Sequence, residues 1–105
     1  MYRMRQLITV TDIDAWNEAI AIVEELNKLS ASKGWAQGVV FTRSFGRFRE
    51  LCLEIEYPDL ATMEREDKEV REEPGIGALL RRFDAIPTED PGYSELWEEA
   101  TPVPD

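Results

Sequence analysis

The stretch Glu50–Tyr57 reads E-L-C-L-E-I-E-Y and alternates between large apolar side chains and glutamate or cysteine. A period of two is typical of a β-strand with one apolar face. Its two faces are Leu51, Leu53, Ile55 and Tyr57 on one side and Glu50, Cys52, Glu54 and Glu56 on the other. Pro58 then ends the strand, and Asp59 is a good N-terminal cap for a helix. This stretch therefore predicts a strand that packs one face on a core and leads directly into a helix.

The rest of the chain extends this pattern to the element order β-α-β-β-α-β. Gly46 marks the turn between the second and third strands, and Pro74-Gly75 interrupts the second helix. The predicted ranges are strand 2–10, helix 11–33, strand 35–44, strand 50–57, helix 59–83 and strand 93–99. The order predicts an α+β fold, the ferredoxin-like sandwich, with a four-stranded antiparallel-type sheet and two helices on one face. We expect residues 1–100 to form one domain and residues 101–105 a short tail.

Each predicted helix has one side assigned to the core. In the first helix, the apolar stripe consists of Ile13, Trp16, Ile20 and Val23, widened by Ala19, Ile22 and Leu29. Thr11 is the expected cap of that helix, and Gly34 its end. In the second helix, the apolar side carries Leu60, Met63 and Val70. Its acidic residues, predicted to face solvent, are Glu64, Glu66, Glu69, Glu72 and Glu73.

Composition limits the possible chemistry. The 105 residues include no histidine and one cysteine, Cys52. Histidine is the commonest general base near neutral pH and the usual nitrogen ligand of metals and haem, so we expect neither a metal nor a cofactor. A net charge of −10 argues against nucleic acid and anionic membranes as partners. A lone cysteine forms no internal disulfide and no apolar run approaches the ~18 residues of a membrane span, so we expect a cytoplasmic protein.

The second face of the sheet is predicted to be mixed rather than polar. Arg3 and Arg5 are expected beside Glu50 and Glu54, with the first and third strands as parallel neighbours. The other members are Leu7 and Cys52, then Val40 or the pair Val39 and Phe41, and Leu96 or Trp97. A solvent-exposed ladder of ion pairs is one explanation. We favour the other, in which two copies pack sheet to sheet around a half-polar cavity, because exposed tryptophan and phenylalanine otherwise need a partner.

The segment G-R-F-R-E-L-C-L-E-I-E-Y-P-D-L-A-T-M-E-R-E, residues 46–66, resembles the dimeric α/β-barrel superfamily in its passage from strand to helix. Within it, NIPSNAP-like proteins and antibiotic-biosynthesis-type monooxygenases are the most similar. The resemblance covers about residues 1–100 and implies a homodimer whose paired sheets enclose a pocket. It implies no single reaction, because the superfamily includes oxygenases, isomerases, haem-degrading enzymes and ligand-binding modules. Haem-degrading relatives bind haem iron through histidine, so we reject that activity for this sequence.

Six side chains are candidate ligand-binding residues of such a pocket: Arg3, Arg5, Arg43, Cys52, Glu54 and Trp97. Guanidinium groups suit carboxylates and enolates, and burial would make a glutamate a general base. Glu54 and Arg43 are therefore weak catalytic candidates, although we favour simple pairing of arginine with glutamate. Cys52 has no histidine to activate it and is expected to be an inert thiol.

We therefore predict a homodimer that binds a small organic molecule between its sheets. The alternative is a cofactor-independent monooxygenase or isomerase acting on an aromatic or polyketide-like compound. The resemblance implies tryptophan, asparagine and arginine for such oxygenases; Trp35 and Trp97 are the tryptophan candidates, whereas Asn17 is expected to lie away from the pocket. A third hypothesis is an interaction protein whose acidic helices meet a basic partner.

Overall fold

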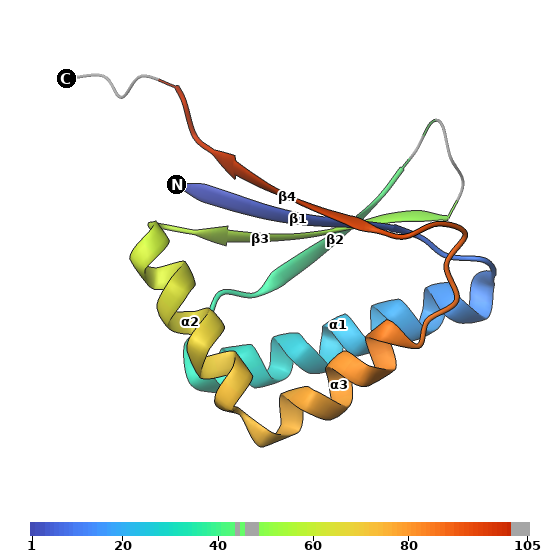
Figure 1. Cartoon of the computed structure of the whole chain (residues 1–105), viewed down its shortest axis with the longest axis horizontal. Helices are drawn as coiled ribbons and strands as arrows, with labels where there is room; N and C mark the ends of the chain where they lie inside the picture. The colour runs from blue at the N-terminus through green and yellow to red at the C-terminus, as the bar shows by residue number, and fades with distance from the viewer. Residues whose placement is uncertain (44, 46–48, 102–105) are drawn as a thin grey trace.

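The computed structural model describes residues 1–43, 45 and 49–101. In this part of the chain, four strands form one sheet and three helices lie on one side of it (Figure 1). The elements are β1 (Tyr2–Thr9), α1 (Ile13–Lys33), β2 (Gly38–Thr42), β3 (Glu50–Tyr57), α2 (Leu60–Glu72), α3 (Pro74–Asp84) and β4 (Tyr93–Glu98). This is the predicted α+β ferredoxin-like architecture with one helix more. The turn predicted at Gly46 and residues 102–105 of the predicted tail lie outside the described residues.

The sheet has the strand order β2-β3-β1-β4, and each neighbouring pair is antiparallel. The parallel pairing predicted for β1 and β3 is therefore wrong. Helix α1 returns the chain so that β2 runs parallel to β1, and β3 then runs back between them. The register sets Arg3 opposite Glu56 and Arg5 opposite Glu54, whereas Glu50 lies opposite Thr9. The predicted proximity of the two arginines to Glu54 is thus confirmed, and their proximity to Glu50 is not.

Helix α1 begins and ends as its sequence predicts, with one change at the cap. The Asp12 carboxylate, rather than the Thr11 hydroxyl, accepts the backbone N–H of Ala15 at 2.8 Å. Gly34 ends the helix with φ = 73°, a left-handed conformation that glycine adopts without a Cβ clash. The 21-residue helix is therefore defined at both ends by local chemistry.

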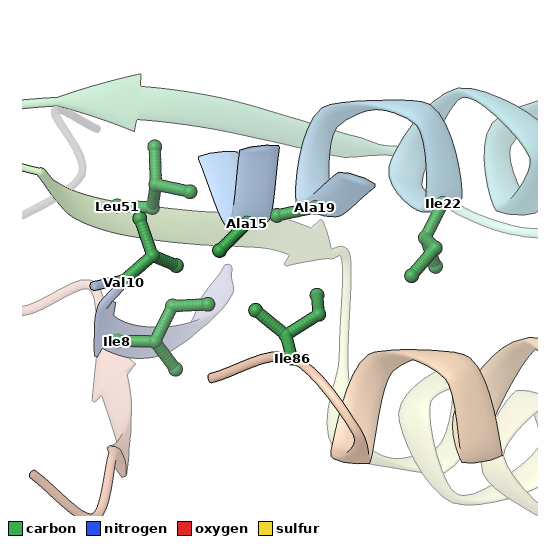
Figure 2. Packing of buried hydrophobic residues seen from close by; sticks show 7 residues of the cluster. All are labelled: Ile8, Val10, Ala15, Ala19, Ile22, Leu51 and Ile86. Carbon is green, nitrogen blue, oxygen red and sulfur yellow. The ribbon is translucent and has the colours of Figure 1, made fainter. Parts of the chain in front are cut away.

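The core lies between α1 and the apolar faces of β1 and β3. Figure 2 shows its buried cluster, which consists of Ile8, Val10, Ala15, Ala19, Ile22, Leu51 and Ile86. Ile22 is fully buried, whereas Ile13 is 65% exposed, so the predicted stripe was wrong at the start of the helix. The small side chains of Ala15 and Ala19 face the sheet instead, and this allows the helix backbone to approach it closely.

Two predicted elements have different limits in the structure. Strand β2 is shorter than predicted, because Trp35 and Ala36 precede it and contact α2 instead. The interruption predicted at Pro74-Gly75 divides the second helix into α2 and α3. Proline has no N–H to donate and its fixed φ suits the first position of a helix, so Pro74 ends one helix and begins the next.

Candidate functional site

The side of the sheet opposite the helices, here called the open sheet face, carries alternate residues of all four strands (Figure 1). Ile8, Val40 and Leu51 pack in or against the core, so their strand neighbours point the other way. The alternatives in β2 and β4 are thereby resolved in favour of Val39, Phe41 and Trp97. The open sheet face consists of Arg3, Arg5, Leu7, Val39, Phe41, Glu50, Cys52, Glu54, Glu56, Tyr93, Glu95 and Trp97.

A network of charges occupies the middle of the open sheet face. The Glu54 side chain is 13% exposed, and its two oxygens lie 2.7 Å from Arg3 Nε and 3.0 Å from Arg5 Nε. Arg3 also pairs with Glu56. The Arg5 guanidinium lies 5.3 Å from the centre of the Trp97 ring, within the range of a cation–π contact. The structure thus brings together four of the six predicted site residues, but in the arginine–glutamate pairing that we favoured over catalysis.

Arg43 and Cys52 complete the set of predicted residues. Arg43 Nε donates to Glu50 at 2.7 Å, and Glu50 lies four residues before Glu54 on β3, about 13 Å away along a strand. Arg43 therefore pairs at a separate point of the face. Cys52 lies between Glu50 and Glu54 on the same side of β3. Burial raises the pKa of the Cys52 thiol by more than Arg5 lowers it, which fits an unactivated thiol.

A cavity of about 220 Å³, here called the helix-side cavity, lies on the other side of the sheet. Its lining residues come from β1, β3, the three helices and the chain around the start of β2. Its apolar walls include Met4, Val23, Leu26, Leu53, Ile55, Val70, Ile76, Leu80 and Phe83. Its polar groups come from Gln6, Asn27, Ser30, Trp35, Tyr57, Glu66 and Asp67. An apolar cavity with a few convergent polar groups is the usual form of a small-molecule site. The ligand site predicted from the sequence lies on the opposite side of the sheet, and the sequence pattern does not predict this cavity.

Two glutamates of α2 accept hydrogen bonds from the segment that precedes β2, beside the cavity. Glu66 is 5% exposed, and each of its carboxylate oxygens accepts the backbone N–H of Ala36 at 3.2 Å. One turn further along, Glu69 accepts the indole N–H of Trp35 at 2.6 Å. The prediction that the acidic residues of this helix all face solvent is therefore wrong for Glu66. Its carboxylate is instead a buried acceptor beside the cavity.

Asn27 and Tyr57 supply the neighbouring polar groups. The Asn27 amide donates to the Gly38 carbonyl and accepts from the Gly38 N–H, both at 2.8 Å, so this amide is held in one orientation. Burial raises the pKa of the Tyr57 phenol, and the charges of Glu66 and Asp67 raise it further. Tyr57 is consequently an uncharged hydroxyl group in the cavity at neutral pH.

One feature of the sequence indicates that Glu66 is buried. It lies three residues after Met63 and four before Val70, which are two members of the apolar side predicted for this helix. That spacing places all three on one helix face. A glutamate within an apolar stripe is unusual and indicates a buried, hydrogen-bonded carboxylate.

Among residues 1–43, 45 and 49–101, no three histidine, cysteine, aspartate or glutamate side chains gather in a way that could hold a metal ion. Over the same residues, no helix has both the length and the apolar character that a membrane crossing requires. The open sheet face and the helix-side cavity are therefore the two candidate sites that we consider.

These features define a ferredoxin-like α+β protein with one uncovered sheet face and a cavity beneath its helices. Solved structures with the same fold include an uncharacterised NIPSNAP domain protein from Burkholderia xenovorans, with a TM-score of 0.75, 16% identity and 100% coverage of both chains. A NIPSNAP family protein from Agrobacterium tumefaciens has a TM-score of 0.70 and 11% identity over 98% of both chains. An antibiotic biosynthesis monooxygenase has a TM-score of 0.69 and 12% identity over 96% of this chain and 100% of its own.

The similarity lies in the fold and not in the sequence. No family model matches the chain, and no curated protein matches it. The expected likeness to NIPSNAP and antibiotic-biosynthesis-monooxygenase proteins is confirmed as a likeness of structure. At these identities, a shared fold carries no residue role from one protein to another.

Proposed function

We propose that this protein is a homodimer that binds a small, largely apolar organic molecule in the helix-side cavity of each copy. The observation that carries the proposal is the cavity itself, which is lined mainly by apolar side chains and includes polar groups that hydrogen bonds hold in place. An apolar cavity of about 150 Å³ accommodates benzene, so one of about 220 Å³ suits a molecule of one or two rings.

The open sheet face is the surface through which we propose that two copies associate. Val39, Phe41, Tyr93 and Trp97 are each more than half exposed there, although residues of these types are usually covered. The same face presents both arginine and glutamate. The arginines are paired with glutamates of the same chain, so a second copy of this face could pack on it around a twofold axis without bringing unpaired charges into the interface. The five charged and aromatic residues predicted to line a pocket between the sheets would then lie at the dimer interface.

Replacing Phe41 with aspartate is expected to separate the dimer. Phe41 is 52% exposed on the open sheet face, so the substitution removes no core contact but would place a charge inside the interface. Light scattering at micromolar concentration should give about twice the 12.1 kDa chain mass for the wild type and about one chain mass for the variant.

Ile13→Asp is the matched control for this experiment. Ile13 is also exposed and apolar, but it lies on α1, on the opposite side of the sheet. The control should stay dimeric, and circular dichroism should show that both variants are folded. A monomeric wild-type protein would rule out the proposed dimer.

The binding site is tested by filling the cavity. Val70 lines the cavity from α2, so Val70→Trp should occupy the space in which a ligand would lie. A panel of one- and two-ring aromatic compounds is titrated by calorimetry. We expect compounds that bind the wild type to lose at least about tenfold in affinity in this variant, and to bind Lys68→Trp, on the exposed side of the same helix, as they bind the wild type.

The same titration separates the two possible ligand positions. Binding that survives Val70→Trp but is lost in Phe41→Asp would place the ligand between the sheets, where the sequence analysis expected it. An absence of binding across the whole panel would contradict the proposed function. Thermal unfolding of each variant confirms that any lost binding is not lost folding.

The second candidate function is a cofactor-independent monooxygenase or isomerase reaction on an aromatic compound. It is favoured by the fold shared with an antibiotic biosynthesis monooxygenase and by Trp35 and Tyr57 in the cavity wall. Against it, Trp35 and Asn27 are already hydrogen bonded to Glu69 and Gly38, and the described residues of the cavity wall include no arginine. Oxygen uptake with dihydroxy-aromatic compounds is the measurement that distinguishes the monooxygenase reaction from binding alone.

A further inference from the structure

The charged residues among the described lining of the helix-side cavity are all acidic. Glu66 and Asp67 line it from α2, and among its described lining residues there is neither lysine nor arginine. The Asp67 carboxylate is 3.1 Å from Arg71, in a pair whose side chains are both more than half exposed. Exposed pairs of this kind are screened by water, so neither Asp67 nor Arg71 contributes much charge to the cavity, and the buried Glu66 is the main source of its charge.

Glu66 differs from Asp67 because it is buried without a cationic partner in the described part of the chain. Its only donor there is the backbone N–H of Ala36, which both oxygens share. A carboxylate has about four lone-pair positions, so most of its acceptor capacity is left over. A buried carboxylate is costly unless a cation or several donors compensate it. A ligand that brings a donor or a positive charge would supply that compensation.

Tyr57 and Asn27, which line the cavity near Glu66, bring no positive charge to it. Burial, followed by the negative charges of Glu66 and Asp67, raises the pKa of the Tyr57 phenol, as expected for groups that line the same cavity. The Asn27 amide uses its oxygen and one of its two N–H groups on Gly38, so at most one neutral N–H of this side chain is left for a ligand. An anionic ligand would therefore lie beside a buried carboxylate with only neutral donors, such as the Ser30 and Tyr57 hydroxyl groups, and no cation among the described lining residues.

We propose that the helix-side cavity selects cationic ligands, such as an aromatic or alicyclic amine of one or two rings, whose ammonium group donates to Glu66, and that it rejects carboxylates and phosphates. This inference rests on the proposed ligand cavity and names the class of molecule that it takes. The apolar body of the ligand would lie against Leu53, Ile55 and Val70, while its donor group would meet the carboxylate near Ala36.

The test uses three probes with one ring system and three charges: naphthylmethylamine, naphthylmethanol and naphthoate. Each is titrated by calorimetry into the wild type, Glu66→Gln and Glu64→Gln. Glutamine keeps an oxygen that can accept from Ala36 but removes the charge. Glu64 is exposed on the same helix and does not line the cavity. Its variant therefore controls for the change in net charge, which is the same in both substitutions.

The wild type should bind the amine at least about tenfold more tightly than the alcohol, and the alcohol more tightly than naphthoate. Glu66→Gln should remove most of the advantage of the amine and leave the alcohol nearly unchanged, while Glu64→Gln should behave as the wild type. Naphthoate binding as well as the amine, or an equal amine advantage in Glu66→Gln and the wild type, would overturn this inference alone. If none of the probes binds, the ligand cavity itself is refuted together with the inference.

Discussion

Ile22→Ala is expected to lower the free energy of unfolding by about 2–5 kcal/mol, the cost of removing a large side chain from a packed core. Ile22 is fully buried and belongs to the cluster between α1 and the sheet (Figure 2). The loss would be a large fraction of the roughly 5–15 kcal/mol that stabilises a domain. Urea denaturation at one fixed protein concentration measures it, because association of copies would otherwise change the apparent stability.

Ile13→Ala is the control that makes this result informative. It deletes the same atoms from the same helix, but Ile13 is 65% exposed, so the change should stay within about 0.5 kcal/mol. The pair therefore tests the rotation of α1 about its axis. If Ile13→Ala cost as much as Ile22→Ala, the helix would have the orientation predicted from the sequence, and the packing described here would be wrong.

Gly92→Ala is expected to cost about 1–3 kcal/mol, at the upper end of that range, by forcing β4 away from β1. A Cβ at Gly92 would lie 2.6 Å from the Leu7 carbonyl oxygen and 2.8 Å from a methyl carbon of Ile8. The carbonyl belongs to the backbone of a central strand and cannot move aside as a flexible side chain can. Urea denaturation gives the loss, and hydrogen exchange should become faster in β4 before the other strands.

The matched change is Gly75→Ala, in the first turn of α3. A Cβ there meets no atom within 4 Å, and alanine restricts the unfolded chain more than glycine does. We expect a gain of about 0.4–1 kcal/mol. A similar loss in both variants would mean that the close contact between Gly92 and β1 does not decide the outcome.

Strand β3 shows what could be predicted from the sequence. Its alternation identifies both of its faces, because the core makes one face apolar along the whole strand. The same reasoning reached the open sheet face with Arg3, Arg5 and Glu54, even with the direction of β1 relative to β3 reversed. Residues two apart on a strand share a face whichever way the neighbouring strand runs.

The wrong predictions concern properties that the periodicity of apolar residues does not report. Ala15 and Ala19 contribute little to a hydrophobic pattern, yet their small size is what allows α1 to lie close to the sheet. The helix-side cavity is a space left between side chains of several elements, so no single stretch of sequence indicates it. Glu66 is the exception. Its position between apolar residues of one helix face indicates burial, whereas its charge alone predicts a solvent-exposed side chain.

The pair of hydrogen bonds between Asn27 and Gly38 has a consequence for how the molecule avoids aggregation. Strand β2 lies at one edge of the sheet, where unpaired backbone groups can recruit a strand from another molecule. At Gly38, the first residue of that strand, both backbone groups are taken by a side chain of α1 at 2.8 Å. The carboxamide thus takes the place that a peptide group of a fifth strand would occupy, and it blocks strand addition at this end of the edge.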